Sequence, residues 1–304
     1  MKDQTPVRIL DGGLGTSLED KYQVQFSSDS TPLWSSHLLV SDQKTLLECQ
    51  TDFACAGANV LLTATYQTSI AGFASTRTPE WPRGISLPNI GQFLEDATLI
   101  AQEACCRGGE VAISLGPYGA TMIPSTEYSA EYDADHADAK SLFDWHLERW
   151  MLFAKSNGSL SGVSYVAFET IPRLDEIAAI RRMILGNAKI PVWISAVFPG
   201  DGDKLPDGSS VEDVVRTMLS AEVAAKAPWG IGINCTKVDK LDSLVRRYEK
   251  GVQEMVDLGD VLGWPSLVLY PDGTNGEVYN TATKTWELPA GAGGPKAGVC
   301  GDGF

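Results

Sequence analysis

Three side chains able to do acid–base or metal chemistry stand at the ends of apolar segments. Asp11, Glu169 and Cys235 each close a run of residues with the composition of a buried β-strand. A carboxylate can bind an ammonium group or accept a proton, and a thiolate can bind a metal ion. Each residue type is also common in structural roles, as an ion-pair partner or a small buried side chain. Their shared position at strand ends is therefore what predicts a site.

The segments that would position these residues alternate between two patterns. Short runs of mostly continuous apolar residues are typical of strands that are covered on both faces. Longer stretches with apolar residues at helical spacing lie between them. This alternation predicts right-handed strand–helix–strand crossovers, and hence an α/β fold with a parallel sheet. The predicted strands are 7–11, 58–66, 110–115, 164–169, 191–197, 230–235 and 265–270.

A (β/α)8 TIM-type barrel accounts best for this repetition, and an open doubly wound sheet is the alternative. No Gly-x-Gly-x-x-Gly sequence follows a predicted strand, which argues against a dinucleotide-binding fold. In a parallel barrel the carboxyl ends of all strands meet at one rim, where TIM-barrel enzymes place their active sites. The other residues brought to this rim are Thr65, Tyr66, Gly116, Val197, Asn234 and Tyr270.

The composition narrows the classes of partner. The formal net charge of −15 argues against nucleic acid and anionic membrane surfaces, because both are polyanions. The first residues lack the apolar core of a signal peptide, and no apolar stretch approaches the ~18 residues of a spanning helix. The 6 cysteines are few for 304 residues and irregularly spaced, which favours a reducing compartment. We therefore expect a cytoplasmic protein that acts on small molecules.

A series of short motifs extends in order over nearly the whole chain. They lie at 9–16, 32–35, 63–67, 116–119, 168–172, 232–236, 270–272, 276–279 and 284–286. Together they resemble the homocysteine S-methyltransferase family, and most of all its S-methylmethionine-using branch. A full series in order is specific where a single motif would not be.

The resemblance implies a zinc-dependent methyltransferase with a (β/α)8 barrel, active in methionine biosynthesis. The thiol of homocysteine would bind zinc as a thiolate and attack a methyl group of a sulfonium donor, S-methylmethionine or S-adenosylmethionine, to give methionine. Zinc is a Lewis acid that lowers a thiol pKa from its usual value of ~8.5. The donor leaves as a neutral thioether, so positioning and activation of the nucleophile supply most of the catalysis.

The resemblance also assigns roles to residues. Cys235 would be the first zinc ligand and, with Asp11, would act in catalysis, while Glu169 would hold the ammonium group of homocysteine. A cationic donor could lie over aromatic rings, an attraction worth ~0.5–2 kcal/mol. Trp34 serves equally well as the anchor of its loop. The further substrate contacts would be Asp11, Gly12, Thr65, Tyr66 and Asn234, and the donor side Trp34, Tyr118, Glu127 and Tyr128.

The carboxyl-terminal segment departs from the family pattern. Family members continue with a helix and an eighth strand whose Gly-Gly-Cys-Cys end completes a three-thiolate zinc site. Here residues 288–304 are rich in Gly, Ala and Pro, and Val299 and Cys300 stand where the two cysteines would be. We expect a barrel domain at 1–287, an irregular tail at 288–304 and a missing or irregular eighth strand.

This departure limits the zinc site to Cys235 and Cys300, with weak or absent zinc. Two alternatives to the methyltransferase stay open. One is a catalytically impaired, truncated relative that only binds an amino-acid ligand. The other is an unrelated barrel lyase or aldolase that uses Glu169 and Asp11. No lysine stands at a predicted strand end, which argues against a Schiff-base aldolase.

Overall fold

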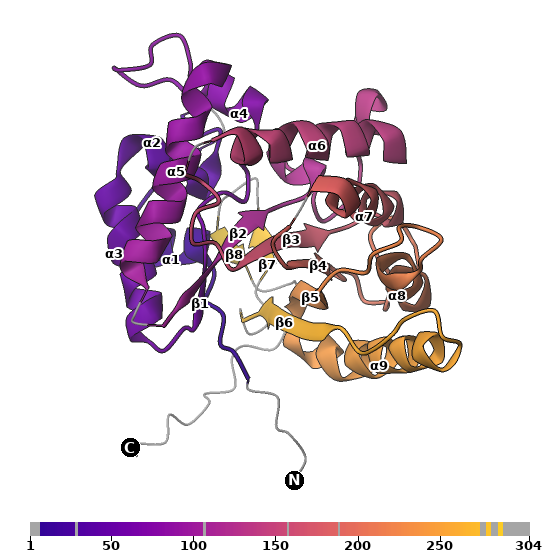
Figure 1. The fold of residues 1–304 in the computed structure, drawn as a ribbon. Helices are drawn as coiled ribbons and strands as arrows, with labels where there is room; N and C mark the ends of the chain where they lie inside the picture. Colours follow the sequence, from indigo (N-terminus) through magenta and orange to yellow (C-terminus); the bar gives the residue numbers. More distant parts are fainter. Residues whose placement is uncertain are drawn as a thin grey trace, which may run out of the picture.

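The computed structural model describes residues 7–27, 30–105, 108–156, 158–187, 189–273, 278–280 and 285–287. Six parallel strands form one sheet in the order β1-β2-β3-β4-β5-β6 (Figure 1). A doubly wound sheet reverses its strand order part-way, and this sheet does not, so the doubly wound alternative is wrong. The strands are β1 (Val60–Leu62), β2 (Glu110–Leu115), β3 (Tyr165–Ile171), β4 (Val192–Ala196), β5 (Gly230–Lys237) and β6 (Ser266–Asp272).

The first predicted strand, 7–11, is present as a short paired segment. Leu10 forms a parallel bridge with Val60. The carbonyl of Ile9 accepts hydrogen bonds from the backbone of Asn59 and Val60, and the Asp11 N–H donates to the Val60 carbonyl at 3.1 Å. The segment therefore extends the sheet beyond β1 and places Asp11 at its carboxyl-terminal edge. The other six predicted strands are confirmed as β1 to β6.

Helices connect the strands and lie outside the sheet (Figure 1). The apolar stripe from Ile90 to Ala104 faces the core from α5, as its spacing predicts. Ser210 caps α8 by accepting a hydrogen bond from the Asp213 N–H at 3.2 Å. The helices are α1 (Leu14–Asp20), η1 (Trp34–His37), α2 (Leu38–Ser41), α3 (Gln43–Cys55), α4 (Ile70–Ser75), α5 (Leu87–Ala104), η2 (Tyr118–Thr121), η3 (Ala134–His136), α6 (Ala139–Lys155), α7 (Leu174–Asn187), α8 (Val211–Leu219), η4 (Val238–Lys240) and α9 (Leu241–Asp257).

The sheet is curled, and its concave face holds a small apolar cluster. Val60, Ala112, Ala167 and Trp193 are buried together there, one from each of β1 to β4. Val268 of β6 packs against the same cluster. The larger core lies between the convex face and the helices. This arrangement closes the interior below the carboxyl ends of the strands and leaves those ends to carry polar groups.

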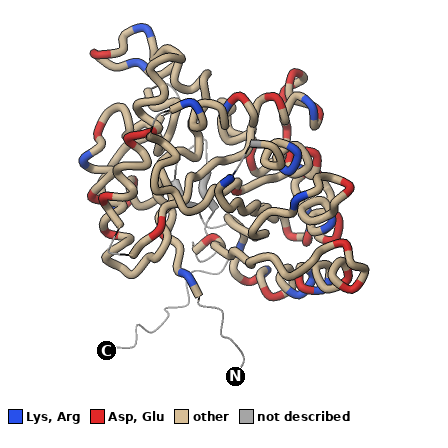
Figure 2. Tube along the Cα trace, in the orientation of Figure 1, with Lys and Arg blue, Asp and Glu red and all other residues tan. Residues whose placement is uncertain are grey.

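Two further strands form a separate antiparallel pair, β7 (Val278–Asn280) with β8 (Thr285–Glu287). The expected irregular tail, the eighth barrel position and Cys300 lie outside the described residues. Among the helices that the structure does describe, none is long and apolar enough to cross a membrane. Asp and Glu residues are spread around the outer helices (Figure 2), which is where much of the net charge of −15 lies.

Candidate active site

Cys235 lies where β5 leaves regular strand geometry. Its backbone φ is +46°, and Thr170 on β3 has a φ of +62°. The register of strand pairing shifts around both residues. Such bulges redirect side chains and are common beside active sites. Here they bring the two side chains together, with Thr170 Oγ1 3.7 Å from Cys235 Sγ.

Asn234 joins the two bulges. Its Oδ1 accepts a hydrogen bond from the Thr170 N–H at 2.7 Å. Its Nδ2 donates to Thr170 Oγ1 at 2.7 Å and to Cys235 Sγ at 3.3 Å. Burial raises the pKa of the Cys235 thiol to about 11, and hydrogen bonds with Thr170 and Tyr128 oppose the rise. The thiol therefore needs a nearby cation to become a thiolate at neutral pH.

The surroundings of this sulfur fit a metal-bound thiolate. Asn234 and Thr170 both donate toward it, and such donors stabilise negative charge on sulfur. Within the described ranges, no three His, Cys, Asp or Glu side chains gather into a complete metal site. Cys235 is the predicted ligand that the structure places at the strand ends, and the other, Cys300, falls in the tail that is not described.

The carboxyl group of Glu169 acts electrostatically on both the Cys235 sulfur and Asp11. Glu169 is 5% exposed and accepts a hydrogen bond from the Ser114 hydroxyl. Burial raises its pKa to about 7, against the lowering effect of Ser114, Tyr270 and the charge of Arg149. Burial also raises the pKa of Asp11 well above its usual range, and the charge of Glu169 adds to the rise.

The orientation of Asp11 leaves one oxygen available. Its Oδ2 accepts a hydrogen bond from the Leu62 N–H at 2.7 Å. Its Oδ1 is buried and has no hydrogen-bond partner in the described part of the chain. Two adjacent carboxyl groups with raised pKa values are stabilised by a shared proton or by a bound cation. The pair is therefore suited to an ammonium group.

Thr65 and Tyr66 follow β1 and are held by a buried arginine. Arg149 of α6 donates to the Gly116 carbonyl at 2.7 Å, to the Thr65 carbonyl at 3.0 Å and to the Tyr66 carbonyl at 2.5 Å. The Tyr66 ring lies against Gly116, where an added Cβ would be 2.7 Å from Cε2. Its hydroxyl hydrogen-bonds Thr170. The arginine thus fixes the turn that aims Tyr66 at the Cys235 side of the rim.

The contacts given for Trp34 and Gly12, two other predicted site residues, are with neighbouring apolar residues and not with Cys235. Trp34 packs against Phe26 at a centroid distance of 5.8 Å and against Gly15, the contacts of a loop anchor. Gly12 lies against Phe53, where an added Cβ would be 2.8 Å from Cε1.

Tyr118 belongs to an aromatic group on the outer side of the rim. Its ring stacks on His136 with centroids 3.9 Å apart, and its hydroxyl donates to Asp133. Its N–H donates to Glu176 at 2.8 Å, and this buried carboxylate also pairs with His146 at 2.9 Å. The described interactions of Tyr118 therefore fasten its own loop.

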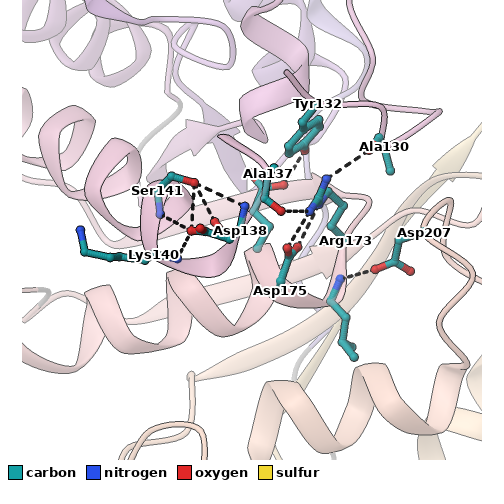
Figure 3. A network of polar contacts seen from close by, with 11 residues as sticks. Ala130, Tyr132, Ala137, Asp138, Lys140, Ser141, Arg173, Asp175 and Asp207 are labelled. Atoms are coloured by element: carbon teal, nitrogen blue, oxygen red, sulfur yellow. Dashed lines mark hydrogen bonds and ion pairs between the residues drawn. The ribbon is translucent and has the colours of Figure 1, made fainter. Parts of the chain in front are cut away.

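The loop that carries Tyr128 is fastened at its far end by Arg173, just after β3 (Figure 3). The guanidinium donates to the carbonyls of Ala130 at 3.4 Å and Ala137 at 3.1 Å, and lies 4.7 Å from the Tyr132 ring centroid. Asp175 holds it in a bidentate ion pair, with a closest N···O distance of 2.6 Å. This anchoring fixes the loop that brings Tyr128 to Cys235.

Comparison with known proteins decides which family this rim belongs to. The sequence pattern of the homocysteine S-methyltransferase family matches residues 8–296. The chain belongs to this family. Homocysteine S-methyltransferase 1 of Brassica oleracea var. italica is 30% identical over 298 aligned residues, covering 93% of this chain and 80% of that protein. Selenocysteine Se-methyltransferase of the same plant is 30% identical over 312 aligned residues, covering 96% and 80%.

A solved structure agrees with these sequence relationships. The metallated form of the homocysteine methyltransferase MmuM from Escherichia coli matches with a TM-score of 0.66 and 26% identity, over 89% of this chain and 85% of that one. Membership in the homocysteine S-methyltransferase family confirms the expected enzyme class and favours it over the binding-only and lyase alternatives.

Sequence reasoning missed three residues of this homocysteine S-methyltransferase rim. Ser114 lies within a predicted strand and Thr170 directly follows one, and the sequence does not show which partner each hydroxyl meets. Arg149 is 3% exposed and stands one position before Trp150, on the buried side of α6. A charged residue on an apolar helical stripe was the signal that could have found it, because such a group is rarely buried without partners.

Proposed function

We propose that this enzyme transfers a methyl group from a sulfonium donor, S-methylmethionine or S-adenosylmethionine, to the thiol of homocysteine. The observation that carries the proposal is the convergence of Cys235 with the Asp11–Glu169 pair at the strand ends of a homocysteine S-methyltransferase fold. In the reaction, a sulfur lone pair of homocysteine forms the new S–C bond. The donor C–S bond breaks, its electron pair stays on the donor sulfur, and the thiol proton is released.

The chain's own residues bind and orient the acceptor. Glu169 and Asp11 would hold the homocysteine ammonium group, since burial raises the pKa of both carboxyl groups and a bound cation would offset that effect. Asn234 and Thr170 would fix Cys235 beside it, and Thr65, Tyr66 and Gly12 would line the same pocket. Zinc, held by Cys235 and Cys300, would lower the pKa of the homocysteine thiol. Trp34, Tyr118 and Tyr128 are the proposed donor-side residues.

Three coarser features complete the proposal. The curled six-stranded sheet would be the larger part of a (β/α)8 barrel with an irregular or missing eighth strand. The barrel domain would comprise residues 1–287, with a tail at 288–304. The small substrates, and the absence of nucleic acid and membrane partners implied by the charge, favour a cytoplasmic location.

The test is methionine formation from homocysteine with each sulfonium donor in turn, using the full chain and added zinc. We expect turnover with at least one donor and none when homocysteine is omitted. Zinc content per chain, measured by elemental analysis, provides a second readout that does not depend on turnover. Absence of methionine with both donors in a folded, zinc-loaded protein would contradict the proposal.

A further inference from the structure

Glu127 is a buried carboxylate that forms no ion pair with the described residues. It lies in the loop between η2 and η3 and is 9% exposed. Its Oε2 is buried and has no hydrogen-bond partner in the described part of the chain, while Ser125 hydrogen-bonds the side chain. A buried carboxylate of this kind costs stability unless a positive charge joins it. The group is therefore suited to a ligand that supplies that charge.

The surroundings of Glu127 place this charge in the candidate site. Its carboxylate acts electrostatically on Tyr66, on Tyr128 and on Cys235. Burial raises the pKa of Glu127 to about 7. The buried cation Arg149 directs its guanidinium to three backbone carbonyls. Glu127 is thus electrostatically coupled to two tyrosines and a thiol of the candidate site.

If Asp11 and Glu169 bind the acceptor homocysteine, Glu127 is available to pair with the charge of the methyl donor. Under the proposed function, Asp11 and Glu169 hold the ammonium group of the acceptor. Among the described residues of the site, Arg149 supplies one positive charge against the carboxyl groups of Asp11, Glu169 and Glu127, a balance that favours cationic ligands. A sulfonium group is a cation without N–H donors, which suits a carboxylate that is coupled to two tyrosines.

We infer that Glu127 is the residue that selects a cationic methyl donor, by pairing with the positive charge of its sulfonium group. The inference rests on the proposed function and adds a specificity-determining residue to it. Methyl transfer turns the sulfonium into a neutral thioether. Glu127 therefore attracts the donor and ceases to attract the spent donor, so it favours exchange of product for fresh substrate. Its contribution is to ground-state binding.

The experiment compares two ligands of nearly the same shape without homocysteine present. S-methylmethionine carries the sulfonium, and 2-amino-5-methylhexanoate carries a neutral CH group in its place. Dissociation constants are measured by calorimetry for the wild type, Glu127→Gln and the control Glu131→Gln, whose carboxylate is exposed. We expect the wild type and the control to prefer the sulfonium roughly tenfold or more. Glu127→Gln should lose that preference while binding the neutral ligand unchanged.

Thermal unfolding shows whether a change in ligand binding by Glu127→Gln results from misfolding of the variant. Removal of a buried unpaired charge should leave the Tm of Glu127→Gln at pH 8 equal to or above the wild-type value. The inference would be overturned if Glu127→Gln lost affinity equally for both ligands. It would also be overturned if this variant kept the wild-type preference for the sulfonium. A wild type that shows no preference or binds neither ligand would have the same consequence. A Glu127-dependent preference in a protein that transfers no methyl group would instead uphold the inference and refute the proposed function.

Discussion

The side chain of Asn234 holds Thr170 by both of its polar atoms. The two hydrogen bonds, to the backbone N–H and to Oγ1 of Thr170, are each 2.7 Å long and cross from β5 to β3. Since β4 separates these strands in the sheet, the contact spans the interior above it. Asn234 therefore sets the position of Cys235 through its neighbour as well as through its own bond to the sulfur.

Replacement of Asn234 by alanine should destabilise the fold. The Thr170 N–H would be left buried without its side-chain partner, a loss of about 1–3 kcal/mol in the free energy of unfolding. Urea denaturation measures this change. The control is Asn89→Ala, because the Asn89 amide bonds Ser86 Oγ near the start of α5 and is exposed. Equal stability of the two variants would show that the inter-strand contact is not formed in solution.

Glu169→Gln should weaken the binding of an amino-acid ligand. Methionine is the suitable probe, because it carries the ammonium group and has no thiol to titrate. Loss of a charge-assisted contact of about 1.5–3 kcal/mol corresponds to a dissociation constant roughly 10- to 150-fold higher. The control Glu103→Gln removes an exposed carboxylate of α5. Unchanged methionine affinity in Glu169→Gln, measured by calorimetry, would reject this ammonium contact.

Stability without ligand should fall as the pH rises from about 4.5 to 7. The pKa of Glu169 is raised from 4.5 to about 7 in the folded protein, so the folded state binds more protons than the unfolded chain in this interval. One such group changes the free energy of unfolding by up to about 1.4 kcal/mol per pH unit. Denaturation of wild type and Glu169→Gln at several pH values measures the difference, and the variant should show the shallower decline. Parallel profiles would contradict the raised pKa.

Cys235→Ser should remove zinc, since a neutral hydroxyl replaces the thiolate ligand. Cys49→Ser is the matched control, because Cys49 is a free, buried cysteine of α3 that packs in the core. Elemental analysis after dialysis gives the zinc content of each variant. The same zinc content in both variants would show that Cys235 is not a ligand.

Arg149→Lys should impair both stability and ligand binding. An ammonium group cannot replace the planar guanidinium that serves the carbonyls of Gly116, Thr65 and Tyr66, and we expect a loss of about 1–3 kcal/mol. Arg181→Lys is the control, since Arg181 is equally buried and bonds backbone carbonyls near α8, away from the rim. Both variants should unfold more easily in urea. Methionine affinity should fall only in Arg149→Lys, and an equal fall in both would show a general effect of instability.

The sheet could be predicted from sequence because its strands are continuous apolar runs separated by amphipathic helices. The same reasoning placed Asp11, Glu169 and Cys235 at one rim, since parallel strands bring their carboxyl ends together. The bulges could not be predicted, because Thr170 and Cys235 adopt positive φ without the glycine that usually marks it. The aromatic residues were harder still. A motif does not show which way a ring such as that of Tyr118 turns, and here His136 holds it.

The consecutive strand order has a consequence for how the protein is made. Ribosomes synthesise Asp11 first among the site residues and Cys235 only 235 − 11 = 224 residues later. Until β5 and β6 emerge, Val60, Ala112 and Ala167 have no Val268 to pack against, and the nascent sheet keeps an open apolar face. The rim that carries Asp11, Glu169 and Cys235 is incomplete during this interval. A growing polypeptide of this topology therefore exposes apolar surface that is prone to aggregation until translation passes its sixth strand.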